Sequence, residues 1–183
     1  MALTIVALMM LGGVASFIPT QDSDATADTP NYASALYGMG RNNYGQQGDG
    51  TTTDVTTPTQ IGSILGTIKS ISASKETTFF LTSEGKLYGM GRNNYGQQGN
   101  GTTTDVLIPT QIGSTLGPIQ SVVCSNNTTF FITADGKLYG MGSNQNYNQG
   151  NGTSTNVLTP TQIGSTLGPI QSVVCSEGNT YFI

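Results

Sequence analysis

One glycine-rich polar phrase occurs three times in this sequence, and its residue types could serve phosphate or calcium binding. The copies are GRNNYGQQGDGTTTD at 40–54, GRNNYGQQGNGTTTD at 91–105 and GSNQNYNQGNGTSTN at 142–156. A phosphate-binding loop requires a lysine and then a serine or threonine directly after its last glycine, between a strand and a helix. No lysine follows these glycines and no helix is expected here, so neither a phosphate site nor a cofactor site is predicted.

Carboxylates at the ends of the first copy raise a second chemistry, calcium binding. Asp49 and Asp54 flank a short threonine-rich segment, but calcium takes about six to eight oxygen ligands, and the segment offers too few charged ones. The third copy has lost both acids, to Asn151 and Asn156. The favoured interpretation is that the glycines let the chain turn and that Asn and Asp side chains cap the turns. No metal site is predicted.

The sequence also lacks a recognisable set of catalytic residues. None of the 183 residues is histidine, so a serine or cysteine nucleophile would lack its commonest base. Cys124 and Cys175 lie 51 residues apart at equivalent repeat positions, and we expect them beyond the roughly 7 Å Cα limit for a disulfide. They are interpreted as buried thiols that act as small hydrophobes. Glu84 and Asp135 fall in expected hairpin turns, so no catalytic residue and no enzymatic activity is predicted.

The phrase also displays a repeated Arg-Asn-Asn-Tyr. Tyrosine and arginine often anchor protein interfaces, and loops on a rigid sheet scaffold are the usual place for such contacts. The alternative is that the tyrosines pack on the sheets while the arginines are solvated. Because the repeats are equivalent, the first Arg-Tyr pair is predicted to behave like the second. The candidate partner-binding residues are Arg41, Asn43, Tyr44, Arg92, Asn94, Tyr95 and Tyr147.

The elements that must position these residues are repeats with a period of 51 residues. The chain divides without insertion into 31–81, 82–132 and 133–183. The block from Pro160 to Ser176 copies the block from Pro109 to Ser125 without a change. Self-similarity at a period of about 20–50 residues is typical of repeat architectures, in which each unit packs mainly on its neighbours. The sequence therefore predicts an array of three units.

Within one unit the pattern is that of short β-strands. Residues 129–133 are rich in aromatic and β-branched types, and residues 137–141 form a second apolar run. The Asp135-Gly136 pair between them predicts a hairpin with a type I′ turn, which needs a positive φ at both central residues. Glu84-Gly85 occupies the same place one repeat earlier, so the same turn is expected there.

Two further strands complete the unit. Ile119–Cys124 is rich in β-branched residues, and Val106–Ile112 contains a proline that confines it to a sheet edge or a strand end. Four short antiparallel strands in a unit of this length describe a propeller blade. We therefore predict an all-β partial β-propeller of about three four-stranded blades, preceded by a hydrophobic N-terminal segment.

The segment GKLYGMGRNNYGQQG at 85–99, followed by Pro109, by 119–125 and by Thr128, resembles the repeat of the regulator of chromosome condensation family. Three tandem matches cover 31–183. The resemblance implies a β-propeller, which in that family usually closes with seven blades, and it raises an exchange-factor-like regulatory role. No residue of this sequence matches the catalytic loop contacts of that role.

This sequence departs from the family pattern at three repeated positions. The family's usual tryptophan is replaced by methionine, the leucine of its Gly-Gln-Leu-Gly by glutamine, and its frequent histidine by threonine or asparagine. These departures leave the fold prediction intact and remove aromatic and imidazole groups. The replaced positions are Met39, Met90 and Met141; Gln47, Gln98 and Gln149; and Thr77, Thr128 and Asn179.

The N-terminal part has a different composition. Residues 1–18 form a hydrophobic leader without charge, and residues 19–30 form an acidic, turn-rich linker. The length of the leader fits a secretory signal, with small residues near Ala15 and Ser16 for cleavage, although no lysine or arginine precedes Arg41. A short membrane anchor and a local hydrophobic strand or helix are the alternatives. The expected location is therefore secreted or membrane-anchored.

The net charge and the number of repeats limit the partners and the assembly that can be expected. Six basic residues against 10 acidic ones give a net charge of −4, so no nucleic-acid partner is expected, and membrane contact would come only through an uncleaved leader. Three blades cannot close a ring, and an open arc leaves sheet edges unpaired. Either the sequence is a piece of a longer propeller or copies join to complete one.

The predicted function is a non-enzymatic protein-interaction module, exported or membrane-tethered. Its partner would be another protein or further copies of itself. The alternatives are a structural protein in which partial propellers associate, and an exchange-factor-like regulator. A sugar-binding propeller is disfavoured because the sequence has no tryptophan for stacking.

Overall fold

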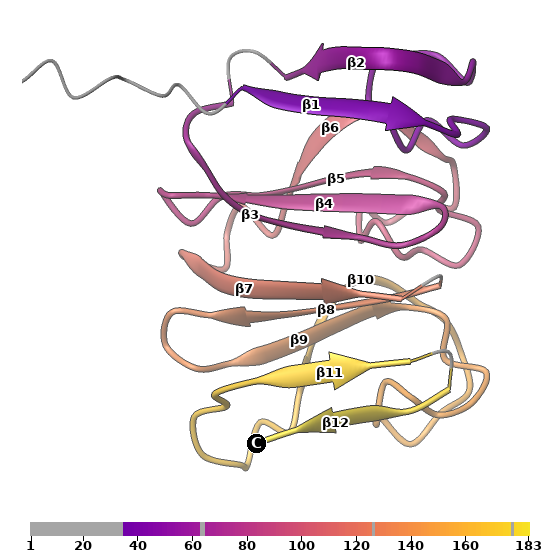
Figure 1. The fold of residues 1–183 in the computed structure, drawn as a ribbon. Coiled ribbons are helices and arrows are strands. Elements are labelled where there is room, and N and C mark those ends of the chain that lie inside the picture. Colours follow the sequence, from indigo (N-terminus) through magenta and orange to yellow (C-terminus); the bar gives the residue numbers. More distant parts are fainter. Residues whose placement is uncertain (1–34, 63–64, 126, 177) are drawn as a thin grey trace, which may run out of the picture. The chain divides into compact units, whose positions relative to one another are not determined.

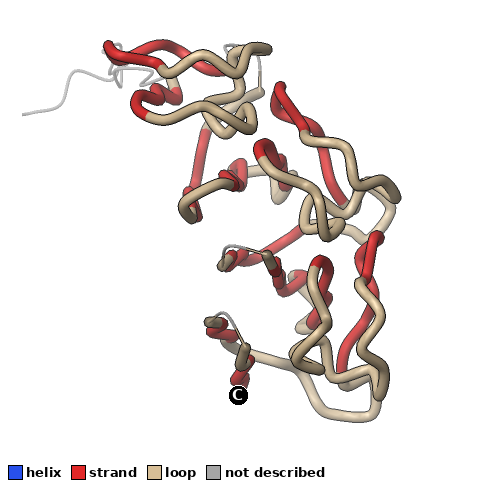
Figure 2. The backbone as a smooth tube through the Cα atoms, turned by 90° about the vertical axis from the view of Figure 1, so that its right-hand side faces the viewer, coloured by secondary structure: helices blue, strands red, loops and turns tan. Residues whose placement is uncertain are grey.

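The computed structural model describes residues 35–62, 65–125, 127–176 and 178–183. These residues form strands, turns and loops, and Figure 2 shows no helix among them. The all-β prediction is thereby confirmed. No helix in the described ranges is long and apolar enough to cross a membrane. The predicted leader at 1–18 and linker at 19–30 lie outside the described residues.

Twelve strands are present in the described ranges, in two complete sheets and two half sheets (Figure 1). All neighbouring strands are antiparallel and follow one another along the chain. The first complete sheet contains β3 (Ile68–Ala73), β4 (Thr77–Thr82), β5 (Leu87–Gly91) and β6 (Val106–Ile112). The second contains β7 (Ile119–Cys124), β8 (Thr128–Thr133), β9 (Leu138–Gly142) and β10 (Val157–Ile163). The half sheets pair β1 (Leu36–Gly40) with β2 (Val55–Ile61), and β11 (Val173–Cys175) with β12 (Thr180–Phe182).

The sheets begin in the middle of the sequence repeats. Each repeat contributes four strands, but the last two of one repeat join the first two of the next in a single sheet. The cause is the tight turn at 83–86, which folds β5 directly back onto β4. The blades expected from the repeats therefore appear as two complete sheets flanked by two half sheets.

These tight turns differ from the predicted type. The turn glycines have positive φ, +78° at Gly85 and +79° at Gly136, whereas Glu84 and Asp135 do not. The Gly85 N–H donates to the Thr82 carbonyl at 3.0 Å. A loop of this kind needs a left-handed conformation at one residue only, so the type I′ prediction is wrong.

The hydrophobic core is divided into three clusters, one for each pair of neighbouring sheets. The central strands carry them, since β4 and β8 bury almost every residue. Adjacent phenylalanines on these strands point to opposite faces, and all four are fully buried. Each complete sheet is thus covered on both sides, as expected when every inner unit packs on its two neighbours. The four phenylalanines are Phe79, Phe80, Phe130 and Phe131.

Candidate functional site

The three glycine-rich copies form the loops that connect β1 to β2, β5 to β6 and β9 to β10. A fully buried asparagine organises each loop. Asn93 donates its amide hydrogens to Asn100 Oδ1 at 3.1 Å and to the Thr102 carbonyl at 3.0 Å, and its Oδ1 accepts from the Gln98 N–H at 2.9 Å. The equivalent bonds recur around Asn42 and Asn144. The loops are therefore held in one conformation by their own side chains.

Glutamine at the family's leucine position has a structural role that the sequence reasoning missed. Gln98 is 1% exposed, and its Nε2 donates to the Met90 carbonyl at 2.8 Å and to the Arg92 carbonyl at 3.3 Å. This ties the loop to β5, whose Gly89 leaves the space that the Gln98 amide occupies. In the sequence, this role could have been inferred from the glutamine that precedes a glycine in all three copies of the loop.

The two acidic residues of the first loop, Asp49 and Asp54, serve as hydrogen-bond acceptors within that loop. Asp49 Oδ1 accepts from the Thr51 N–H and the Thr51 hydroxyl, each at 2.9 Å, and Asp54 Oδ1 accepts from the Asn42 N–H at 2.8 Å. Burial opposes ionisation of Asp49, but the bonds from Thr51 and Asn42 lower its pKa overall. Across the described residues, no three acidic, histidine or cysteine side chains come together as metal ligands would.

The first two loops also form backbone contacts with the next sheet. The Gly50 N–H donates to the Leu107 carbonyl of β6 at 3.0 Å, and the Gly101 N–H donates to the Leu158 carbonyl of β10 at 2.9 Å. Gly45 lies so close to Leu107 that a Cβ built on it would be 2.7 Å from the Leu107 Cα. The glycines of the phrase are therefore required by contact with the neighbouring sheet as well as by turning.

Arg92 lies between two of the predicted contact tyrosines. Its guanidinium group is 5.1 Å from the ring centre of Tyr44 and 5.9 Å from that of Tyr95, close enough for cation–π attraction. It also forms an ion pair of 2.5 Å with Glu76. The hydrogen bond to Glu76 raises the pKa of Arg92, against the opposing effect of burial. This cluster joins the loops of two consecutive repeats.

The structure distinguishes the two arginines that repeat equivalence predicts to be alike. Arg41 is exposed, whereas the Arg92 side chain is 23% exposed and bound to Glu76. The position that stands to Arg41 as Glu76 stands to Arg92 is residue 25, an alanine in the sequence, which precedes the first repeat and lies outside the described residues. One period further along the chain, Asn127 and Ser143 stand in place of Glu76 and Arg92. A charged cluster of this composition is thus specific to the second loop.

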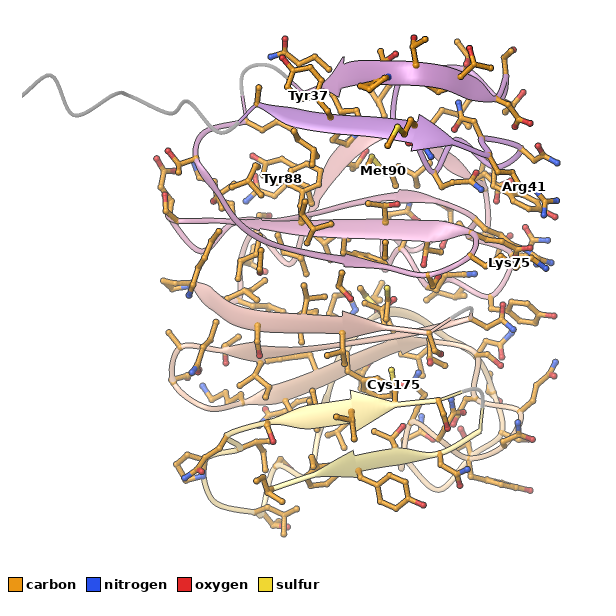
Figure 3. All side chains as sticks on the ribbon, in the orientation of Figure 1. Tyr37, Arg41, Lys75, Tyr88, Met90 and Cys175 are labelled. Atoms are coloured by element: carbon orange, nitrogen blue, oxygen red, sulfur yellow. The ribbon has the colours of Figure 1, made fainter. Side chains whose placement is uncertain are left out.

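The remaining candidate contact residues are exposed. Asn43, Asn94 and Tyr147 face solvent, while Tyr44 and Tyr95 are half-buried. Figure 3 shows Arg41 and Lys75 at the same end of the sheets, where the loops lie. Tyr147 stands at the repeat position of Gly45 and keeps the left-handed backbone of that glycine, with a φ of 60°. The end of the sheets at which these loops lie, here called the loop end, therefore exposes tyrosine, arginine and asparagine side chains on loops that are held by hydrogen bonds.

The cysteines are free thiols away from these loops. Cys124 Sγ lies 3.4 Å from the Ser72 hydroxyl of the neighbouring sheet. Burial raises the pKa of both Cys124 and Cys175, which lowers the thiolate fraction and hence reactivity. Both pack against core clusters.

Comparison with known proteins agrees with this architecture. The family model described as regulator of chromosome condensation (RCC1) repeat matches residues 34–81, 84–132 and 135–183. The ultraviolet-B receptor UVR8 of Arabidopsis thaliana is 34% identical over 157 residues, which are 85% of this chain and 36% of that protein. The human regulator of chromosome condensation is 33% identical over 132 residues, 70% of this chain and 31% of that protein. This chain thus spans about a third of these relatives.

Among solved structures, Prp20p of Saccharomyces cerevisiae superposes with a TM-score of 0.70 at 23% identity, over 80% of this chain and 38% of that one. The likeness is one of fold, and it supports the propeller-type stacking of the sheets. The three matched repeats, which cover most of the chain, establish that the chain belongs to the regulator of chromosome condensation (RCC1) repeat family.

Proposed function

We propose that this chain is a non-enzymatic protein-interaction module whose contact surface is the loop end of its sheets. The observation that carries the proposal is the repeated presence of tyrosine, arginine and asparagine side chains on these loops. Buried asparagines hold the loops in place by hydrogen bonds. Preorganised loops lose little conformational entropy on binding, and arginine and tyrosine supply large contact area with hydrogen-bonding groups.

The relatives support a protein as the partner. The structure of Prp20p is described with its binding properties to Gsp1p and histones, so a protein of the same fold binds other proteins. In this chain, Arg41, Lys75 and Arg92 place half of its six cations at the loop end. An exchange-factor-like role rests on family membership alone, since no residue of the loops described above supports it.

Replacing Arg41 and Asn94 together with alanine is expected to reduce partner recovery at least tenfold, because truncated interface anchors cost on the order of 2 kcal/mol in affinity. Both side chains are exposed, so the melting temperature should stay within about 2 °C. The measurement is quantitative affinity capture with the full chain as bait, alongside thermal unfolding.

The matched control replaces Lys86 and Lys137 with alanine. Each is exposed and, within the described part of the chain, forms an ion pair with a nearby acid in its hairpin turn, Glu84 and Asp135 respectively. Capture should be unchanged in this control. Equal recovery by the wild type and the Arg41/Asn94 variant would contradict the proposed contact surface.

We further propose, from the composition of residues 1–18, that the chain is exported or membrane-tethered. Export predicts a mature chain that begins after about residue 16, since small residues at 15–16 suit a signal-peptide cleavage site. Tethering predicts an intact N-terminus in a membrane pellet. Intact-mass analysis after fractionation of expressing cells separates these outcomes, and an uncleaved chain in the soluble intracellular fraction would contradict both.

A further inference from the structure

Two of the three glycine-rich loops carry an acceptor sequence for N-linked glycosylation. The second loop contains Asn100-Gly101-Thr102, and the third contains Asn151-Gly152-Thr153. Asparagine followed by any residue except proline, and then by serine or threonine, is the sequence at which secreted proteins receive N-linked glycans, usually on a surface loop. The first loop has Asp49-Gly50-Thr51 at the same place, so it repeats the motif without the amide.

The two acceptor sequences lie at the surface of the molecule. Asn100, Gly101 and Thr102 are all exposed, as are their equivalents at 151–153. The second loop is in contact with the next sheet, since the Gly101 N–H donates to the Leu158 carbonyl of β10 at 2.9 Å. Asn100 thus stays exposed in a loop whose neighbouring sheet is in place, and the accessibility of the motif does not depend on a missing neighbour.

The bonding of Asn100 leaves its amide nitrogen unused. Asn100 Oδ1 accepts hydrogen bonds from the Thr102 N–H at 3.0 Å, from the Thr102 hydroxyl at 2.8 Å and from the Asn93 amide at 3.1 Å. Within the described ranges these are its only side-chain hydrogen bonds, so Nδ2 donates to no acceptor there. Asn151 repeats the arrangement with Thr153 and Asn144. The oxygen of each side chain therefore holds the loop, and the nitrogen, which is the atom that receives a glycan, does not.

The first loop shows that no nitrogen is needed at this position. Asp49 Oδ1 accepts from the Thr51 N–H and the Thr51 hydroxyl, each at 2.9 Å, and from the Asn42 amide at 3.0 Å. These are the bonds that Asn100 makes, but a carboxylate has no amide nitrogen. A substituent on the nitrogen of Asn100 or Asn151 therefore breaks no hydrogen bond of the loop.

A third acceptor sequence, Asn127-Thr128-Thr129, differs in its surroundings. Thr129 is fully buried within β8, Thr128 is 2% exposed, and the side-chain oxygen of Asn127 is buried as well. A glycan is bulky and solvated, so it has no room beside side chains that the core covers. The overlapping sequence at 126–128 begins outside the described residues. The structure thus separates two accessible acceptor sites from one that is buried.

We propose that Asn100 and Asn151 are N-glycosylated in the mature protein. The proposal rests on the export proposed above, because the export pathway supplies the transferase and the sugar donor, an oligosaccharide joined through pyrophosphate to a membrane lipid. The Nδ2 atom attacks the first sugar carbon, and the bond from that carbon to the pyrophosphate oxygen breaks. The lipid pyrophosphate leaves and the amide nitrogen loses one proton, so each site gains one N-glycosidic bond.

The test is made on the full chain expressed in eukaryotic cells and recovered from the medium. Enzymatic removal of N-glycans in heavy-oxygen water converts each glycosylated asparagine to a labelled aspartate, which peptide mass analysis locates. Label is expected on Asn100 and Asn151 and not on Asn127. Asn94 is the matched control, because it is an exposed asparagine of the second loop that is followed by Tyr-Gly, and it should stay unlabelled.

Two exchanges between the loops supply the second readout. Asn100→Asp gives the second loop the side chain of the first, so the loop keeps its bonds and the chain should lose one glycan. Asp49→Asn completes the motif in the first loop and should add one glycan. Both variants should be secreted at the wild-type level, since either side chain supplies the same oxygen. Intact mass should therefore fall by one glycan in the first variant and rise by one in the second.

The outcomes distinguish this proposal from that of export. A processed chain in the medium that is unlabelled at Asn100 or Asn151 would overturn the glycan at that site and leave export intact. Equal label on Asn127, or an Asn100→Asp variant with the full mass of the wild-type glycoprotein, would overturn the assignment of the sites. An uncleaved chain in the soluble intracellular fraction would overturn export and the glycans together.

Discussion

Gly96→Ala is expected to lower the free energy of unfolding by about 3 kcal/mol. Gly96 has a φ of +79°, and a Cβ at this residue would lie 2.8 Å from the Leu158 Cα of the neighbouring sheet. The left-handed backbone costs an alanine about 1 kcal/mol, and overpacking against backbone that cannot move away adds roughly 1–3 kcal/mol. Urea unfolding followed by circular dichroism measures the loss.

Gly117→Ala separates the two contributions. Gly117 has nearly the same φ, +82°, but a Cβ there meets nothing within 4 Å. The free energy of unfolding of this variant should therefore fall only by the conformational cost of about 1 kcal/mol. Similar losses in both variants would show that the joint between sheets tolerates a side chain at Gly96. Tyr147, at the equivalent position of the third loop, shows that the backbone conformation itself is accessible to a non-glycine residue.

Asn93→Ala is expected to destabilise the protein by about 3 kcal/mol or more. The side chain is fully buried, and its removal leaves the Gln98 N–H and the Thr102 carbonyl without their bonds from the loop centre. Each hydrogen bond contributes roughly 0.5–1.5 kcal/mol net, and each buried group left unpaired costs about 1–3 kcal/mol. Thermal and urea unfolding measure the change.

The adjacent Asn94 is the control for Asn93, because it has the same side chain in an exposed position. Asn94→Ala should change the free energy of unfolding by no more than about 0.5 kcal/mol. Amide hydrogen exchange adds a local readout, since loss of Asn93 should expose the N–H of Gln98. A loss below about 1 kcal/mol for Asn93→Ala, with Gln98 still protected, would contradict the organising role of the buried asparagine.

Local pattern in the sequence determined the strands of this protein. The expected strands Val106–Ile112 and Ile119–Cys124 coincide with β6 and β7, and 129–133 and 137–141 fall within one residue of β8 and β9. Alternating β-branched and aromatic residues bounded by glycines specify strands through contacts along a few neighbouring residues. The 51-residue period then indicated that the same unit occurs three times in a row. Neither conclusion depends on distant contacts.

Tertiary structure alone decided which strands share a sheet and what the loop residues touch. The repeat period is the same whichever strand pair begins a blade, so it cannot say that the first sheet starts at β3. Arg92 looks like Arg41 in the sequence, but its environment comes from Glu76 on the neighbouring β3–β4 turn and from Tyr44 one repeat earlier. Glu76 reaches Arg92 through the pairing of β4 with β5, in which Thr77 lies opposite Gly91. Tyr44 comes from the loop of another sheet and meets Arg92 only when the sheets pack, and packing is set by the whole surface of each blade and not by any local pattern.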